Sequence, residues 1–299
     1  MIDLSVLSRE ELITLSLRAL YSKSGYAQYK MSKFEEYDFY ARNKSFLASE
    51  SVITFTDTDG RLLALKPDVT LSIVKNGKDE REDKVYYNEN VYRPDKGTKT
   101  FKEIMQTGLE LIGEVGEEQI AEVITLACRS LEVISPESVL ELSHLDFVDG
   151  VLKSAALNDG AIKEVKKALS QKNAEAIACI ADREGADGAK LCSLVSLYGK
   201  ADEVVEKLAR FECGQTKSAI AEIKSVTERL KSSGAIDKIV IDFSLTSNGN
   251  YYNGFAFRGF IEGVPTSVLA GGQYDNLMKK MKRKARAIGF AVYLDEIGR

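Results

Sequence analysis

Two polar residues in the stretch FKEIMQTGLELIG (residues 101–113) have a spacing that could do chemistry. The stretch is predicted to be a β-strand, and Gln106, Gly108 and Glu110 then share one face because successive side chains point to opposite sides. An amide oxygen and a carboxylate on one face suit an ammonium group, which offers three hydrogen-bond donors. Gly108 between them would leave room for a ligand against the sheet. The other interpretation of Glu110 is an exposed strand carboxylate without a ligand.

The composition gives little support to metal or nucleic-acid chemistry. The four cysteines are widely spaced, with no CxxC pair, and the chain has one histidine, His144. This inventory is poor for a metal site and typical of an intracellular protein with reduced thiols, so we expect no metal and no cofactor. The net charge of −4 and the pI near 5.4 disfavour tRNA as a partner, because nucleic-acid binding draws on Lys and Arg. The basic cluster at residues 279–286 is interpreted as a solvated helix end and loop rather than a phosphate-binding patch.

The length of 299 residues allows one large α+β domain with an insertion, or two modest domains. No apolar run approaches the roughly 20 residues needed to span a bilayer, and the N-terminus lacks the layout of a signal peptide. We therefore expect a cytoplasmic protein that does not associate with membranes.

The elements that must position these residues alternate between strand-rich and helical stretches. A helix is predicted after a capping box of Ser8 and Glu11, with apolar residues at Leu12, Leu15, Leu17 and Leu20. A hairpin turn is predicted at Asp59-Gly60 in VITFTDTDGRLLAL (52–65), and strands are predicted at 84–93, 101–113, 138–147, 238–243, 251–263, 265–272 and 288–294. Helices are predicted at 116–134 and from Gln273, and residues 151–233 are expected to be entirely helical. This order predicts one sheet, mostly antiparallel and flanked by helices, with a helical insertion.

Four segments in this order resemble the catalytic domain shared by histidyl-tRNA synthetase and its paralogue, the regulatory subunit of ATP phosphoribosyltransferase. They are LALKPDVTLSIVKNG (63–77), VYYNENVYRPDKGTKTFKEIMQTGLELIG (85–113), YYNGFAF (251–257), and LAGGQYDNLM with AIGFAVYL (269–278 and 287–294). The second resembles class II motif 2 and the last resembles motif 3. The resemblance implies an α+β class II synthetase-like domain over residues 1–150 and 234–299, with the insertion at 151–233 and no anticodon-binding domain after Arg299.

The resemblance also implies a site for a histidine-like ligand. Positions that hold the amino group of histidine in the family correspond to Asp68, Thr70, Gln106 and Glu110. The paired aromatic positions of the side-chain pocket correspond to Tyr251 and Tyr252, whose other interpretation is half-buried strand aromatics. Arg93 matches the motif 2 arginine and is expected to contact a phosphate or other anion, or simply to form an ion pair.

Departures from the synthetase pattern argue against aminoacylation, which needs cations to bind ATP and stabilise its developing charge. Where the family has the motif 3 arginine this chain has Glu296, and two further family arginines are replaced by Ser247 and Gln273. The motif 2 loop, Gly97-Thr98-Lys99-Thr100, is also one residue shorter. We expect essentially no adenylation and no catalytic residues.

The resemblance therefore implies a noncatalytic regulatory subunit of short-form ATP phosphoribosyltransferase, needed for the first step of histidine biosynthesis and its feedback inhibition by L-histidine. A hetero-oligomer with the catalytic subunit is expected, as is a homodimer that pairs around residues 26–40, where simple packing over the sheet is the alternative. Two other functions stay open: a histidyl-tRNA synthetase catalytic fragment, and a synthetase-like binding module with another partner.

Overall fold

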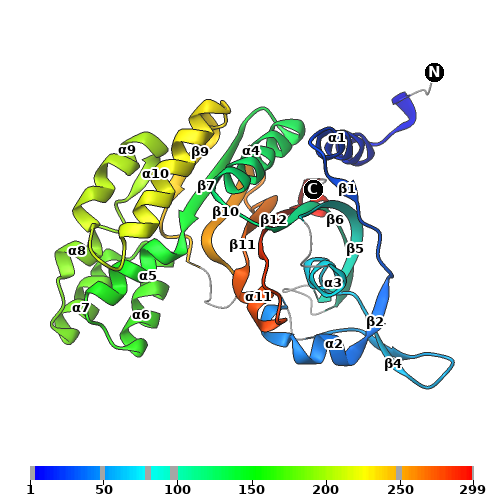
Figure 1. The fold of residues 1–299 in the computed structure, drawn as a ribbon, viewed down its shortest axis with the longest axis horizontal. Coiled ribbons are helices and arrows are strands. Elements are labelled where there is room, and N and C mark those ends of the chain that lie inside the picture. The colour runs from blue at the N-terminus through cyan, green and yellow to red at the C-terminus, as the bar shows by residue number, and fades with distance from the viewer. Residues whose placement is uncertain (1–3, 48–50, 78–81, 95–99, 247–250, 298–299) are drawn as a thin grey trace.

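The computed structural model describes residues 4–47, 51–77, 82–94, 100–246 and 251–297, which form an α+β fold around one large sheet (Figure 1). Its nine described strands lie in the order β1-β5-β6-β12-β11-β10-β7-β9-β8. Neighbouring strands are antiparallel except for the β1–β5 and β7–β9 pairs. The predicted fold class, a mostly antiparallel sheet flanked by helices, is confirmed. The strands are β1 (Ala27–Gln28), β5 (Asp83–Pro94), β6 (Phe101–Gly113), β7 (Ser138–His144), β8 (Tyr198–Lys200), β9 (Ile239–Asp242), β10 (Asn253–Ile261), β11 (Leu269–Gln273) and β12 (Arg286–Tyr293).

Strand β6 carries Gln106 and Glu110 and is hydrogen-bonded to a neighbouring strand on each side. It pairs with β5 over almost its full length, with Glu89 opposite Gln106 and Val85 opposite Glu110. On its other side it pairs with β12, with Gly289 opposite Glu110. Because both edges of β6 are hydrogen-bonded, side chains on this strand start from a backbone that has little freedom to move.

Helices α1 (Arg9–Lys23) and α4 (Glu117–Ile134) pack together against the large sheet. The predicted capping box is confirmed: the Glu11 amide donates to Ser8 Oγ at 3.2 Å, and the Ser8 amide donates to Glu11 Oε2 at 2.8 Å. The predicted apolar face is partly wrong, because Leu12 and Leu15 are 40% and 44% exposed. The buried face instead consists of Ile13, Leu17 and Tyr21, spaced by four residues along the helix.

A second, three-stranded sheet of β2 (Phe34–Glu36), β4 (Leu62–Leu65) and β3 (Thr54–Thr56) projects from the main body. The predicted hairpin at Asp59-Gly60 is confirmed as the connection between β3 and β4. Gly60 adopts φ +79°, and Asp57 Oδ1 accepts from the amides of Asp59 and Arg61 at 2.9 and 2.8 Å. Glycine tolerates this conformation without a Cβ clash, and the Asp57 carboxylate satisfies two turn amides.

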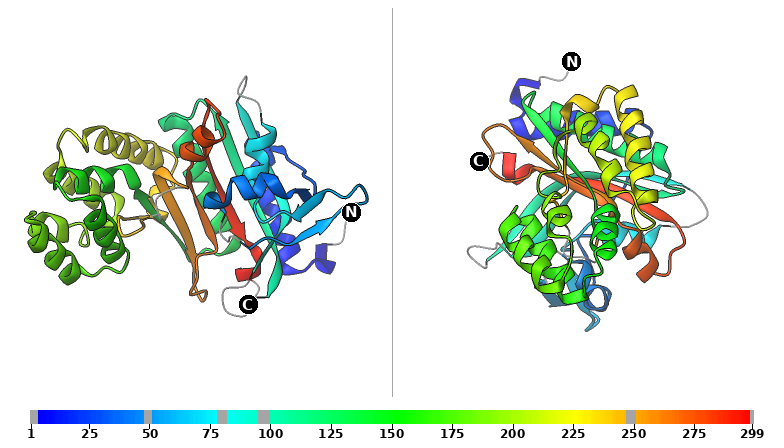
Figure 2. Two further views of the ribbon diagram at one scale, coloured as in Figure 1. Left: turned by 90° about the horizontal axis from the view of Figure 1, so that it is seen from below. Right: turned by 90° about the vertical axis from the view of Figure 1, so that its left-hand side faces the viewer.

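Residues 151–233 are mostly helical, and with α5 they gather at the end of the molecule opposite the three-stranded sheet of β2, β3 and β4 (Figures 1 and 2). The expectation of an entirely helical segment is wrong at β8, which pairs antiparallel with β9 and so joins the large sheet. The strand predicted for 138–147 ends at His144, whose Nδ1 accepts from the Phe147 amide and caps the helix that follows. The helices are α5 (Leu145–Ser154), α6 (Asp159–Ser170), α7 (Ala174–Glu184), α8 (Gly188–Cys192), α9 (Ala201–Lys207) and α10 (Lys217–Ser232).

The last described segment returns to the sheet through β11, α11 (Asp275–Lys280), β12 and α12 (Leu294–Ile297). The helix predicted to start at Gln273 starts at Asp275 instead, because Gln273 is the last residue of β11. Asp275 accepts hydrogen bonds from the Ala287 amide at 2.9 Å and from Arg286 Nε at 3.0 Å, which fix α11 against β12. None of the helices within the described ranges is long and apolar enough to cross a membrane.

Candidate functional site

A cavity of about 280 Å³ lies on one face of β6, and all seven predicted ligand-contacting residues line it. The segments that supply them are far apart in sequence: 68–70, 93, 106–110 and 251–252. The lining consists of Ser45, Phe46, Leu47, Asp68, Thr70, Tyr87, Arg93, Gln106, Glu110, Tyr251, Tyr252, Ala270, Tyr274, Gly289, Phe290, Ala291 and Tyr293. The tertiary structure therefore brings the predicted residues together, while their role in binding stays a prediction.

Glu110 lies buried in this cavity with both carboxylate oxygens engaged. Thr70 donates to Oε1 at 2.8 Å and Tyr274 donates to Oε2 at 2.7 Å. Room for the carboxylate comes from Gly289 on β12, since a Cβ at that position would stand 1.7 Å from Glu110 Oε2. Burial raises the pKa of Glu110 to about 8, against the opposing effect of the two hydroxyls. A positive charge brought by a ligand would favour the ionised form of this carboxyl and lower its pKa.

Asp68 and Arg93 form an ion pair at the cavity wall. Arg93 Nη2 lies 3.4 Å from Asp68 Oδ2, and Arg93 Nε donates to the Pro67 carbonyl at 2.5 Å. The other oxygen of Asp68 accepts from the Leu71 amide at 2.8 Å, at the start of α3 (Thr70–Asn76). Burial raises the pKa of Asp68, and the Arg93 guanidinium opposes that shift. The ion-pair interpretation of Arg93 agrees with these contacts, and a contact to a ligand phosphate stays a prediction.

Tyr251 and Tyr252 form an aromatic wall of the cavity. Their ring centroids are 4.7 Å apart, and Tyr251 also lies 6.1 Å from Tyr274 and 6.1 Å from Phe46. Both tyrosines precede β10 (Asn253–Ile261) and do not belong to a strand. The alternative that they are strand aromatics is therefore wrong on that point. Burial raises the pKa of both hydroxyls well above the usual value, so they remain neutral donors at any physiological pH.

Several lining residues were not predicted from the sequence. Tyr274 is the hydroxyl donor to Glu110, and its position in the LAGGQYDNLM segment was a signal that sequence reasoning did not use. Tyr87 fills the space beside Gly108, where an added Cβ would stand 2.5 Å from the Tyr87 hydroxyl and 2.3 Å from the Phe290 carbonyl oxygen. The expectation that Gly108 leaves room for a ligand is therefore wrong, because the glycine accommodates the protein itself.

A second cavity of about 260 Å³ adjoins the first and shares Arg93, Gln106 and Tyr293 with it. Two acidic residues, Asp295 and Glu296, line this second space. Glu296 accepts from Thr266 Oγ1 at 2.8 Å and Asp295 accepts from the Met105 amide at 3.2 Å, so both carboxylates are held in place. Two cations, Arg93 and Lys102, line the same space, so the two carboxylates offset the positive charge that the phosphates of a nucleotide would need.

Of the other positions that depart from the synthetase pattern, the structure describes Gln273 but not Ser247. Gln273 is fully buried, and its Oε1 accepts from the Phe255 amide at 2.6 Å, which makes it a structural residue of the β10–β11 pair. Ser247 and the loop positions Gly97, Thr98 and Lys99 lie outside the described residues. Over the described ranges there is no group of three or more His, Cys, Asp or Glu side chains that could hold a metal ion.

Comparison with known sequences supports the resemblance seen in the four segments. The histidyl-tRNA synthetase family model matches residues 5–297. An ATP phosphoribosyltransferase regulatory subunit from Caldanaerobacter subterraneus subsp. tengcongensis is 30% identical over 289 residues, covering 94% of this chain and 75% of the relative. A protein of the same name from Clostridium kluyveri is 29% identical over 294 residues, with the same two coverages, 94% and 75%.

Solved structures share the fold. The crystal structure of an ATP phosphoribosyltransferase regulatory subunit/histidyl-tRNA synthetase from Bacillus halodurans C aligns with a TM-score of 0.85 at 25% identity, covering 99% of this chain and 80% of that chain. A chain of the ATP phosphoribosyl transferase (HisG:HisZ) complex from Thermotoga maritima aligns with a TM-score of 0.75 at 18% identity, covering 95% and 97%. The second likeness, at its lower identity, is one of fold.

Proposed function

The chain belongs to the histidyl-tRNA synthetase family, and we propose that within this family it is a noncatalytic regulatory subunit of ATP phosphoribosyltransferase. The curated relatives that match it over most of its length carry that name. The proposed partner is a short-form catalytic subunit, with which this chain forms a hetero-oligomer. The complex would catalyse the first step of histidine biosynthesis, and the transferase chemistry would belong to the partner.

One structural observation carries this proposal. The cavity offers acceptors for an amino acid, while the adjoining space has Glu296 where a synthetase needs a cation for ATP. Among the described lining residues of the first cavity Arg93 is the sole cation, and it is already bonded to Asp68 and to the Pro67 carbonyl. Such a site can bind an amino acid without activating it, which suits an effector site better than a synthetase active site.

We propose L-histidine as the effector of this cavity. Its ammonium would be held by the acceptors that the resemblance assigns to the amino group, Asp68, Thr70, Gln106 and Glu110, and its ring would lie against Tyr251 and Tyr252. An effector shifts a complex only by binding its two states with different affinity. Histidine would therefore bind the less active state of the complex more tightly, which produces feedback inhibition.

The experiment that tests the function is a reconstitution. A short-form catalytic subunit is assayed for ATP phosphoribosyltransferase activity with and without this chain, and histidine is then titrated. We expect activity to depend on this chain and to fall as histidine rises. Activity that is independent of a well-folded preparation of this chain would contradict the proposal. Histidine-dependent pyrophosphate exchange with ATP would instead support the synthetase alternative.

We also propose that the chain forms a homodimer and that residues 151–233 are an insertion into the domain of residues 1–150 and 234–299. Among the aromatic residues at positions 26–40, Tyr26 and Tyr40 are buried, three are half-buried and Phe34 is exposed. Exposed apolar side chains nearby lie on the three-stranded sheet, where the rings of Phe34 and Phe55 make an edge contact at 5.5 Å. An exposed apolar cluster of this kind is typical of an interface.

The four cysteines, all without disulfide partners, support a cytoplasmic location.

Charge placed in the Phe34–Phe55 cluster is expected to dissociate the homodimer. The double variant Phe34→Asp/Phe55→Asp should sediment as a monomer at concentrations where the wild type is dimeric, because two carboxylates would be buried without partners. Val133→Asp, at an exposed apolar position on α4, is the matched control and should remain dimeric. A dimer that withstands the double substitution would place the interface elsewhere.

A further inference from the structure

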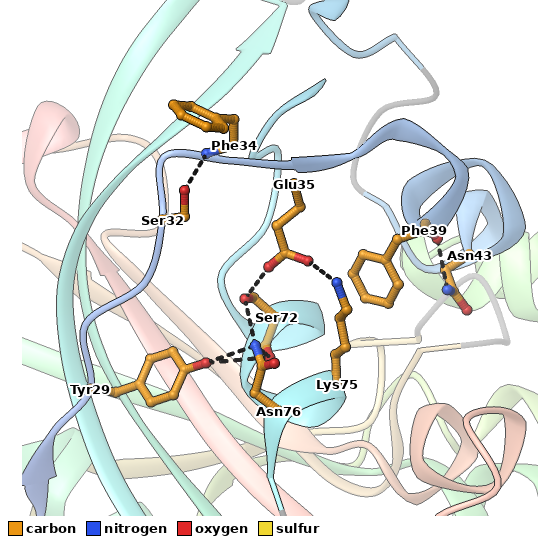
Figure 3. A network of polar contacts seen from close by, with 9 residues as sticks. All are labelled: Tyr29, Ser32, Phe34, Glu35, Phe39, Asn43, Ser72, Lys75 and Asn76. Atoms are coloured by element: carbon orange, nitrogen blue, oxygen red, sulfur yellow. Dashed lines mark hydrogen bonds and ion pairs between the residues drawn. The ribbon is translucent and has the colours of Figure 1, made fainter. Parts of the chain in front are cut away.

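Helix α3, which begins at the cavity residue Thr70, is short and is hydrogen-bonded on two opposite sides. α3 spans Thr70–Asn76, and Asp68 accepts from its Leu71 amide. On one side Thr70 donates to Glu110. Two residues along a helix correspond to a rotation of about 200°, so Ser72 faces nearly the opposite way. There the Ser72 hydroxyl donates to Glu35 Oε1 at 2.5 Å (Figure 3).

Glu35 comes from β2 and contacts two successive turns of α3. Its second oxygen lies 2.6 Å from Lys75 Nζ, three residues after Ser72 and therefore on the same side of the helix (Figure 3). Ser72 is fully buried, and the Glu35 side chain is only 10% exposed. The Lys75 ammonium also lies 4.7 Å from the centroid of the Phe39 ring. One nearly buried carboxylate thus ties the β2–α2 segment, with α2 at Tyr37–Arg42, to the pocket helix.

Further contacts on this side of α3 extend the same network. Asn76 Nδ2 donates to the Ser72 carbonyl at 2.9 Å and to the Tyr29 hydroxyl at 3.1 Å. Tyr29 is in turn fixed by its amide, which donates to the Tyr86 carbonyl on β5 at 2.8 Å. The side of α3 that faces away from the cavity is therefore hydrogen-bonded to both the small sheet and the large one.

Apolar packing alone would not set the rotation of this helix. Leu71, Ile73 and Val74 are buried and hold α3 against the core, but hydrophobic contact is non-directional. Hydrogen bonds are directional and weaken steeply when distance or angle changes. An isolated helix of two turns is also marginal in water, so its geometry depends on tertiary contacts.

We propose that Glu35 is a positioning residue for the ligand pocket: by holding Ser72 and Lys75 it fixes the rotation of α3 and keeps Thr70 and Asp68 directed at the ligand. This inference rests on the proposed function, since it takes histidine as the ligand of the cavity. Glu35 does not line the cavity, so its effect on binding passes entirely through α3. Glu35 lies outside the four segments that carry the family resemblance.

The test compares histidine binding and folding stability in full-length variants at pH 8. Glu35→Ala and Ser72→Ala should each lower the affinity for L-histidine about tenfold by calorimetry, because a hydrogen bond to a charged group is lost in each. Their double variant should bind about as well as Glu35→Ala alone, because the contact that Ser72→Ala removes is already lost when Glu35 is replaced. Glu122→Ala is the matched control, because Glu122 forms another ion pair, with Lys84 at 2.8 Å. The affinity of this variant for L-histidine should stay within about twofold of the wild-type affinity.

A purely structural role for Glu35 predicts a different pattern. Glu35→Ala would then melt at a lower temperature but bind histidine as the wild type does, and this result would overturn the proposal. Ser72→Ala provides the same test if Glu35→Ala fails to fold. Wild-type protein that binds no histidine would remove the effector assignment and this inference together, whereas wild-type binding with unchanged variants removes the inference alone. In Glu35→Ala the dependence of affinity on pH should remain that of the wild type, because Glu110 is retained.

Discussion

Replacing Glu110 with glutamine is expected to lower the affinity for L-histidine about hundredfold at pH 8, because a buried charge partner of the ligand is removed. The change is nearly isosteric, so it tests charge rather than shape. One of the two hydroxyls, Thr70 or Tyr274, can still donate to the glutamine oxygen, and the other can accept from its amide nitrogen. Calorimetric titration of histidine into the wild type and the variant measures the difference.

The pH dependence provides an independent test of the same carboxylate. Burial raises the pKa of Glu110 to about 8, so most of the carboxyl is protonated at pH 7 and about half is ionised at pH 8. A cationic ligand binds the ionised form, so affinity should rise about fivefold between pH 7 and pH 8, where free imidazole is already mostly neutral. Glu110→Gln should lose this rise.

The contribution of Glu110 to folding stability falls as the pH rises, whereas the affinity for the ligand rises. A carboxyl whose pKa is raised on folding stabilises the fold fully below its unfolded value, near 4.5, and that contribution is lost as the pH rises through about 8. Glu114→Gln, at an exposed position just beyond β6, is the control. It should change neither the affinity for L-histidine nor the pH dependence of folding stability. Equal affinities and equal pH profiles for wild type and Glu110→Gln would show that Glu110 does not hold the ligand's positive charge.

Replacing Lys66 with methionine is expected to destabilise the fold by about 3 kcal/mol or more, because it leaves a largely buried carboxylate without its partner. Lys66 Nζ lies 2.5 Å from Glu89 Oε2, and the two side chains are 1% and 18% exposed. Lys66 also joins the elements around the site, since its amide donates to the Lys33 carbonyl and its carbonyl accepts from the Tyr92 amide. Urea denaturation measures the free energy of unfolding.

Two further variants separate the charge effect from packing. Lys66→Met/Glu89→Leu should recover most of the lost stability, because replacing both members of a buried pair removes the uncompensated charge. Arg183→Gln breaks an exposed pair with Glu164 at 3.1 Å and should cost less than about 1 kcal/mol. A single Lys66→Met variant as stable as the wild type would mean that Glu89 is adequately solvated without its partner.

Local patterns in the sequence were sufficient for much of the fold. The Ser8–Glu11 capping box and the turn at Asp59-Gly60 were predicted correctly because each depends on residues within a few positions of one another. The long antiparallel pair of β5 and β6 follows from two extended runs joined by a polar loop. The motif matches also predicted which residues would line one cavity, although no spacing rule alone would have joined positions 68, 106 and 251.

Errors occurred where tertiary contacts chose between locally equal alternatives. Leu12 and Leu15 were expected on the buried face of α1, but packing against α4 selected the face of Ile13, Leu17 and Tyr21. The short strand β8 lies in a region of helical composition, and its pairing with β9 defines it as a strand. Propensity is a weak prior in three-residue segments, where the partner strand supplies the hydrogen bonds.

The sequence by itself determined most of the element types, the order of the motifs and which residue types line the first cavity. The tertiary structure decided the environment of those residues: the burial that raises the pKa of Glu110, the Arg93–Asp68 ion pair, and the bond from Glu35 to Ser72 across 37 positions. Backbone geometry repeats over a few residues, so local patterns report it directly. Burial and charge pairing depend on which distant segments meet, and that is known only once the chain is folded.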